Sequence, residues 1–455
     1  MVIGIRGLLP QPFPGRNPID REGQFATGAH RSRGLTVNAH LVKGRDALLG
    51  LLRGDAPLLS KPDISQTISF ARITLIVGLV FLHYQEFPDL GESPFVGMDI
   101  SQHPVATFVN SFILFFFVSV VPLLSMVSGW LFFSFNPQEA ALSLRRRIRR
   151  RVSSLYLPLV FWNALFLLLL GLLFVGDPGY PLLAGINIHF GSATWMDYVN
   201  AVFGITQHPV GFQFWFVRDL FVTMLVSPLL WLSLKHAPYL GMAFLAVAWM
   251  SGSHLVIFFR TDVVFFFYLG GFLRTREIPL HVGRKAAYGL LITYVTLVAL
   301  RTMAPMFIDL AHQRPYWLTG ATRSMRLVGV LACWSVFLQL ARTRFGTVVA
   351  RYGGLAFFLH AIHYPLIAEV KILLWHLVPV QTDGWLIAHF FVSVAVTVTI
   401  GMWVGVQLAR RAPRLFALMN GGRPGLFAEP RAAVPARAPV PEPDATTSGA
   451  FKDAI

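Results

Sequence analysis

The sequence predicts an all-α membrane protein, a polytopic bundle of about ten transmembrane helices with both termini in the cytoplasm. Of the 455 residues, 55% are hydrophobic and 14% are aromatic. The mean hydropathy of +0.59 is too high for a soluble globule with a wettable surface. The apolar residues also form runs of membrane length, which predict spans near residues 65–87, 107–135, 156–175, 212–234, 239–259, 263–273, 287–305, 321–341, 355–370 and 385–408.

The charge distribution indicates the orientation of these spans. The net charge is +16, but lysine and arginine are concentrated in particular loops, as the positive-inside rule expects, so we expect no nucleic-acid partner. With the N-terminus inside, the cytoplasmic loops contain residues 145–151, Lys235, Arg274, Arg276, Arg284, Lys285, Arg342, Arg344, Arg351, Arg410 and Arg411. One outer loop departs from the rule, because it holds Arg314 and Arg323, with Arg301 and Arg326 close to its edges.

Composition divides the chain into three parts. Residues 1–62 are polar, basic and rich in Gly and Pro, which predicts a cytoplasmic N-terminal extension without a cleavable signal sequence. Residues 63–411 hold the apolar runs and form the membrane domain. Residues 412–455 are rich in Pro, Ala and Gly, which predicts a disordered cytoplasmic tail. The single cysteine, Cys333, excludes an internal disulfide and a cysteine metal cluster.

The first span carries two ionisable residues, Arg72 and His83. Placing an ionisable side chain in hydrocarbon costs free energy, so both residues are candidates for a functional role. They are 11 residues apart, about 16 Å along a helix, so Arg72 lies nearer one membrane face and His83 nearer the other. His83 suits a general base, or it is an interfacial residue satisfied by water. Arg72 suits an anion-binding site, or it snorkels to the cytoplasmic interface.

Six arginines follow the second span in the stretch LRRRIRRR, residues 144–151. Topology and anionic lipid explain such a run, but it would also suit the phosphates of coenzyme A. In the fourth span, Arg218 and Asp219 are adjacent. Adjacent helical positions point about 100° apart, so we expect these two to pair with other helices and not with each other. A structural intramembrane ion pair is the alternative.

His360 and His363 lie three residues apart in the ninth span, on one face of the expected helix. This spacing also suits a metal ion. Because no third ligand stands at a recognisable spacing, we expect no metal site.

Several of these segments together resemble the acyltransferase 3 family of integral-membrane O-acyltransferases. The resembling motifs, in chain order, are Arg72 with His83, SGWL at 128–131, the pairs Arg146/Arg149 and Arg147/Arg150, a Pro-aromatic stretch at 158–162, FWFVRDL at 214–220, and residues 357–365, which select His363 over His360. The resemblance covers roughly residues 65–408. Two features depart from it: Ser69 stands where an Asp often precedes the first-span Arg by three residues, and the short tail lacks the esterase-like domain that some relatives append.

The resemblance implies transfer of an acyl group from cytoplasmic acyl-coenzyme A to a hydroxyl of a cell-envelope glycan or its lipid-linked precursor, in a bacterial inner membrane. The exopolysaccharide-modifying members look most similar, and the acyl group is acetyl or succinyl. His83 would be the base or a transiently acylated residue, and Arg72 would offset developing negative charge. The remaining candidates are Arg146, Arg147, Arg149, Arg150 and Arg218 for acyl-coenzyme A, together with Ser128, Asp219 and His363.

Two other classes of protein stay open. A transporter or flippase of envelope precursors also places Arg, Asp and His in the membrane, although the internal repeats typical of carriers are not evident. A scaffold in a polysaccharide-assembly complex would not need its polar membrane residues. The enzyme hypothesis expects the polar residues of the first, fourth and ninth spans to meet at one cavity, with His83 facing it and not the lipid.

Overall fold

The computed structural model describes residue 50, residues 59–310 except 89, 92 and 279, residues 315–378, residues 382–423 and residue 425. The chain divides into two units, Met1–Leu52 and Arg53–Ile455, and the second contains all the helices named below. Its described residues form helices and no β-strand, which confirms the all-α prediction. Most of the predicted N-terminal extension, and residues 426–455 of the predicted disordered tail, lie outside the described residues.

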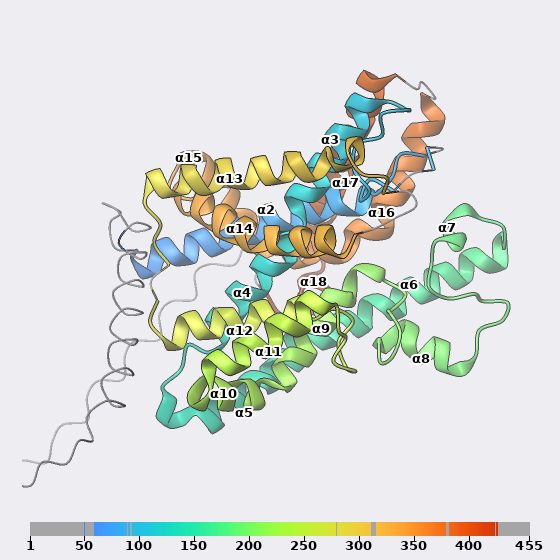
Figure 1. Cartoon of the computed structure of the whole chain (residues 1–455). Helices are drawn as coiled ribbons and strands as arrows, with labels where there is room; N and C mark the ends of the chain where they lie inside the picture. The colour runs from blue at the N-terminus through green and yellow to red at the C-terminus, as the bar shows by residue number, and fades with distance from the viewer. Residues whose placement is uncertain are drawn as a thin grey trace, which may run out of the picture. The chain divides into compact units, whose positions relative to one another are not determined.

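The order of the helices along the chain is shown in Figure 1. The α-helices are α2 (Lys61–Tyr84), α3 (Pro104–Phe117), α4 (Val120–Phe132), α5 (Ala140–Arg151), α6 (Leu157–Gly176), α7 (Pro181–Ala184), α8 (Trp195–Phe203), α9 (Trp215–Leu225), α10 (Ser227–His236), α11 (Pro238–Ser251), α12 (Asp262–Thr275), α13 (Arg284–Thr302), α14 (Tyr316–Leu340), α15 (Arg344–Arg351), α16 (Ala356–Leu377), α17 (Asp383–Arg411) and α18 (Pro413–Met419).

Several helices of the described chain can cross a membrane by length and composition. Six segments qualify: Lys61–Tyr84, Pro104–Phe132, Pro137–Gly176, Tyr316–Leu340, Arg344–Leu377 and Asp383–Arg411. The pair Phe212–Leu225 and Ser227–His236, bent by 58°, makes a seventh candidate. The other three predicted spans fall on α11, α12 and α13. Because α11 and α12 have 14 residues each, they are about 21 Å long against a hydrocarbon core of about 30 Å. The chain is a membrane protein, and its ten-span topology stays a prediction.

Helix α2 lies inside the bundle. It begins at Lys61, earlier than the sequence predicts, because Ser60 and Asp63 form a capping box in which each side chain accepts a hydrogen bond from the other residue's backbone N–H. Its neighbours are α3, α4, α14, α15, α16 and α17. Residues at its two ends can therefore contact several other helices.

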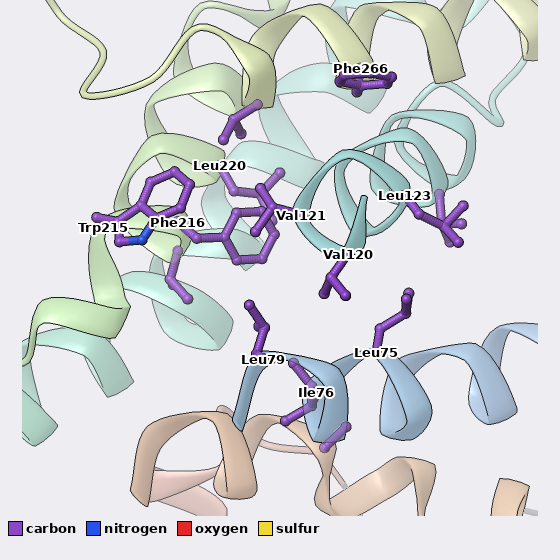
Figure 2. Packing of buried hydrophobic residues seen from close by; sticks show 14 of the residues in the cluster. Leu75, Ile76, Leu79, Val120, Val121, Leu123, Trp215, Phe216, Leu220 and Phe266 are labelled. Carbon is purple, nitrogen blue, oxygen red and sulfur yellow. The ribbon is translucent and has the colours of Figure 1, made fainter. Parts of the chain in front are cut away.

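Figure 2 shows the apolar packing where α2, α4, α9 and α12 meet. The buried side chains labelled there are Leu75, Ile76 and Leu79 of α2, Val120, Val121 and Leu123 of α4, Trp215, Phe216 and Leu220 of α9, and Phe266 of α12. Leu79, Val121 and Trp215 also line the cavity beside His83. This apolar core therefore fixes the walls of that cavity.

Helices α4 and α12 are in backbone contact, and two glycines make this possible. A Cβ atom on Gly129 would lie 1.9 Å from the carbonyl oxygen of Phe267, and one on Gly270 would lie 1.9 Å from that of Met126. Small residues allow such close approach of membrane helices. Gly129 is the glycine of the SGWL motif, so this contact gives that motif a structural reason.

Helix α18 corrects part of the tail prediction. Phe416 and Met419 are buried, the indole N–H of Trp162 donates to the carbonyl of Met419 at 3.0 Å, and the Asn420 amide donates to the carbonyl of Gly354 at 2.9 Å. The prediction of disorder is wrong for this stretch. The prediction followed the Pro- and Ala-rich composition of the tail as a whole. It therefore overlooked Phe416 and Met419, which are buried in the structure.

Candidate active site

The imidazole of His83, at the end of α2, contacts the imidazole of His363 in α16. The distance from His83 Nδ1 to His363 Nε2 is 2.6 Å, and the rings are within 4° of parallel. His360, the other histidine of the pair in the ninth predicted span, packs instead against aromatic rings, including those of Phe214 and Phe357. The resemblance to the family selected His363, and His363 is the one of the two histidines that forms a hydrogen bond with His83.

A break in α16 positions His363, and Gln213 supports the break. Tyr364 has non-helical dihedral angles (φ −120°, ψ 128°), and Pro365 follows it. Because proline has no N–H, it cannot donate to the carbonyl of Ala361 four residues earlier. The amide of Gln213 replaces that donor, since its Nε2 donates to the carbonyls of Ala361 at 2.8 Å and of Tyr364 at 2.9 Å.

The hydrogen bonds of His363 determine the tautomers of both rings. His363 Nδ1 lies 2.7 Å from the carbonyl oxygen of His360. A carbonyl only accepts, so this nitrogen carries the proton, and in a neutral ring Nε2 is then an acceptor. His83 Nδ1–H must be the donor to it, which leaves the lone pair of His83 on Nε2. No described residue forms a hydrogen bond with His83 Nε2.

His83 lines a cavity of about 460 Å³, which we name the His83 cavity. Its wall includes Leu79, Val121, Phe212, Trp215, Arg260, Arg301, Arg323 and Arg326. These residues come from the end of α2, the start of α4, the segment leading into α9, the segment before α12, the end of α13 and the first half of α14. His83 therefore faces a cavity, as the enzyme hypothesis expects.

The expected meeting of polar residues from the first, fourth and ninth predicted spans at one cavity is found only in part, because His83 lines the cavity and His363 does not. The fourth predicted span brings Phe212, Gln213 and Trp215 to the histidine pair and its cavity. Arg218 and Asp219, which the sequence singled out, are not among the residues that line this cavity.

Arg218 and Asp219 pair with each other, so the expectation that they pair with other helices is wrong. Arg218 Nη1 donates to Asp219 Oδ1 at 2.9 Å, because the long arginine side chain folds back over the angle between adjacent positions. Arg218 also donates to the carbonyls of Gly204 at 2.9 Å and Ile205 at 2.8 Å, and to the carbonyl of Ile257. Arg218 therefore joins the loop after α8 to the loop before α12. This is a structural role and not that of a ligand-binding cation.

Replacing Arg218 with Met is therefore expected to destabilise the protein without changing, in the folded fraction, the KM for the acyl donor that the resemblance implies. Breaking a buried ion pair costs about 3–5 kcal/mol. The thermal midpoint of the purified protein in detergent measures the loss. Arg149→Met, at an exposed position, is the matched control and should leave the midpoint unchanged. A raised KM with an unchanged midpoint would place Arg218 at the donor site instead.

Arg72 lies in the middle of α2, and its side chain is exposed. Its positive charge acts on two other arginines, Arg151 and Arg423. Burial, together with the positive charges of Arg72 and Arg151, lowers the pKa of Arg423 to about 9. Arg423 donates to the carbonyls of Ser154 at 3.1 Å and Asn420 at 2.9 Å. Arg72, Arg151 and Arg423 thus form a positive group between α2, the end of α5 and the segment after α18.

The arginine run divides into a structural member and exposed members. Arg147 donates to the carbonyls of Leu131 at 2.8 Å, Phe132 at 3.0 Å and Ser134 at 2.9 Å, so it caps the end of α4. The exposed members named by the sequence are Arg146, Arg149 and Arg150. Ser128, also a candidate, donates to the carbonyl of Leu124 within its own helix at 2.7 Å.

A second cavity, of about 810 Å³, lies near the arginine run, and we name it the Arg274 cavity. Its wall includes Ile64, Trp130, Trp231, Lys235, Arg274 and Arg276. These residues lie at the start of α2 and at or next to the ends of α4, α10 and α12. The guanidinium of Arg274 lies over the ring of Trp130, 4.9 Å from its centroid.

The two cavities lie at opposite ends of the same helices. α12 runs from Asp262, next to Arg260 of the His83 cavity, to Arg274, and α2 runs from Ile64 of the Arg274 cavity to His83. At 1.5 Å per residue, the ends of α12 are separated by about 18 Å. The Arg274 cavity and the histidine pair are therefore separated by about the length of α12.

Sequence reasoning missed three groups of residues at this site. Gln213 directly precedes the FWFVRDL motif. The signal for such a residue was Pro365, because proline cannot donate to the carbonyl of Ala361 and another donor, here Gln213, must replace it. Arg423 lies in the tail predicted to be disordered. Of the arginines of the His83 cavity, Arg301, Arg323 and Arg326 were noticed only as an exception to the positive-inside rule, and Arg260 was not noticed. Within the described residues, no group of three or more His, Cys, Asp or Glu side chains could hold a metal ion.

A family model described as an acyltransferase domain matches residues 66–406. The chain therefore belongs to the acyltransferase 3 family, and it is an acyltransferase. Among curated proteins it is similar to the succinoglycan biosynthesis protein ExoH of Rhizobium meliloti (strain 1021), with 27% identity over 370 residues, which cover 80% of this chain and 94% of that relative. No solved structure matches the chain.

Proposed function

We propose that this chain is an O-acyltransferase of a bacterial inner membrane. It moves an acyl group, acetyl or succinyl, from acyl-coenzyme A to a hydroxyl of an exopolysaccharide or of its lipid-linked precursor. Family membership supports the acyl transfer, and the similarity to a protein named for succinoglycan biosynthesis supports the polysaccharide. The observation that carries the proposal is His83, whose ring lines a cavity and keeps its Nε2 lone pair available.

His83 Nε2 acts as the general base in this reaction. It takes the proton of the acceptor hydroxyl while the hydroxyl oxygen forms a bond to the thioester carbonyl carbon. The tetrahedral centre then collapses, the carbon–sulfur bond breaks, and the proton passes from His83 to the departing thiolate. The products are the glycan ester and free coenzyme A, and His83 returns to its first state. A transient acyl-His83 would use the same nitrogen.

His363 positions His83 for this step. Its Nε2 accepts the Nδ1–H of His83, and its own Nδ1–H is fixed by the carbonyl of His360. A fixed partner on one ring nitrogen selects the tautomer and the orientation of the other. Gln213 supports the same turn from the short segment that precedes α9.

The donor would enter from the cytoplasmic end. With ten spans and both termini inside, the arginine run faces the cytoplasm, and its exposed members Arg146, Arg149 and Arg150 would meet the phosphates of coenzyme A. Arg72, about 16 Å from His83 along α2, would offset negative charge on the donor as the thioester passes toward the cavity. The bilayer and a polysaccharide-assembly complex are the expected surroundings.

Membranes that contain the protein should transfer label from labelled acetyl- or succinyl-coenzyme A to surface polysaccharide, and membranes from a deletion strain should not. Mass spectrometry of the polysaccharide identifies the acyl ester and its carrier. If the deletion removes the polymer from the cell surface but leaves its acylation intact in the cell, the chain would be a transporter or flippase. Equal acylation with and without the protein would also contradict the proposal.

A further inference from the structure

The His83 cavity contains four arginines that the proposed reaction does not use: Arg260, Arg301, Arg323 and Arg326. Three of them, Arg301, Arg323 and Arg326, are the arginines in or near the outer loop that departs from the positive-inside rule. Topology therefore does not explain why they are present. Their position in the same cavity as His83 indicates a role with a substrate.

Two of these arginines share one carboxylate. Asp262 Oδ2 is 2.7 Å from a guanidinium nitrogen of Arg260 and 3.0 Å from one of Arg326. The Arg260 side chain is nevertheless 46% exposed, against 16% for Arg326, and its guanidinium lies over the ring of Trp215, 4.7 Å from the centroid. Arg260 is thus held in place and still accessible from the cavity.

The other two arginines contact the backbone of the cavity wall. Arg301 donates to the carbonyls of Val96 at 2.9 Å and Phe95 at 3.2 Å, and Arg323 donates to the carbonyl of Met250. A backbone carbonyl does not neutralise the guanidinium of Arg323.

Among the described residues, the cavity lining holds four arginines and no Asp or Glu. Asp262 forms ion pairs with two of the four arginines, and Asp309 precedes the lining residue Leu310. In the part of the cavity that the structure describes, four guanidinium groups exceed these two carboxylates.

We propose that these arginines bind a carboxylate carried by one of the two substrates. Guanidinium groups present a planar pair of donors that matches a carboxylate, and the excess charge is attracted most strongly to an anion where water is partly excluded. The carboxylate belongs either to a dicarboxylic acyl group or to an acidic sugar of the acceptor. The inference takes its two substrates from the proposed function, but the anion site itself does not require acyl transfer.

Binding of small carboxylates to the purified full-length protein tests the site without any reaction. Succinate and glucuronate are the probes, and dimethyl succinate and glucose are their neutral counterparts. We expect at least one carboxylate to bind, and its affinity to fall about tenfold or more in Arg260→Gln and in Arg323→Gln and to weaken with added salt. Arg344→Gln, at an exposed position away from the cavity, is the control and should bind like the wild type.

Failure of both carboxylates to bind the wild type would overturn the inference, as would binding that the two cavity variants leave unchanged. The melting curves of both variants show whether they are folded. If one variant does not fold, the other still tests the site. Carboxylate binding without acyl transfer from any donor would keep the site and reject the proposed function.

The source of the carboxylate follows from transfer kinetics. If it lies on the acyl group, Arg260→Gln raises the KM for succinyl-coenzyme A and leaves that for acetyl-coenzyme A unchanged. If it lies on the acceptor, the variant raises the KM for an acidic oligosaccharide and leaves that for its neutral, carboxyl-reduced form unchanged. A KM that rises equally for charged and neutral substrates would contradict carboxylate recognition.

Discussion

His83→Ala is expected to lower the rate of acyl transfer by about 10²–10⁴-fold, the usual contribution of a general base. The reason is that His83 Nε2 keeps its lone pair beside the cavity while Nδ1–H is fixed on His363. Release of free coenzyme A by purified protein in the presence of acceptor, followed with a thiol reagent, measures the rate. His363→Leu should lower kcat less than His83→Ala does and leave KM unchanged, because His363 orients the base and does not contact substrate.

A histidine on the same helix as His363 provides the control. His376 is exposed, and its Nδ1 contacts the carbonyl of Ile372 within α16. His376→Ala should therefore keep the wild-type rate. If His83→Ala transferred acyl groups within about twofold of the wild-type rate while remaining folded, the base would have to be another residue, since such a change is far below the contribution expected of a general base.

Gly129→Ala is expected to destabilise the protein by about 3 kcal/mol, the upper end of the usual cost of overpacking. The new Cβ would lie 1.9 Å from the carbonyl oxygen of Phe267, so α4 and α12 must move apart. Moving either helix disturbs both cavities, since each cavity is lined by residues at or beside the ends of these helices. The thermal midpoint of the detergent-solubilised protein measures the effect, and activity should fall with the folded fraction.

Gly289→Ala is the matched control, because Gly289 lies inside α13 and nothing surrounds its Cβ position within 4 Å. Alanine favours a helix over glycine by about 1 kcal/mol, so this variant should be as stable as the wild type or slightly more so. Equal midpoints for Gly129→Ala and the wild type would show that α4 and α12 are not in backbone contact.

Periodicity and hydropathy predict the helices well, because a membrane segment must satisfy its backbone hydrogen bonds internally. The same reasoning singled out His83, since an ionisable residue in an apolar run has few explanations. The resemblance to the family added His363, and the two rings meet although 280 residues separate them. No periodicity within either segment could predict that contact.

Contacts between distant segments are what the sequence could not supply. In the sequence, Arg218 and Asp219 suggest ligand-binding residues. In the structure, Arg218 donates to the loop carbonyl of Gly204, and Asp219 accepts from the backbone N–H of Arg260. Arg260 itself follows a predicted span and carried no signal until Asp262 and Trp215 were placed beside it. The order in residues 413–419 depends likewise on burial of Phe416, which composition does not reveal.

The central claim is that the donor enters at the end with the arginine run and that transfer takes place at the opposite end, where His83 lies. Proteoliposomes with the protein in one orientation test it most directly, with acyl-coenzyme A supplied on one side and the glycan acceptor on the other. We predict that ester forms when acyl-coenzyme A is on the side of the arginine run and the acceptor on the side of the His83 cavity, and that it does not form when the two are exchanged. Ester formation at the same rate in both arrangements would contradict the account.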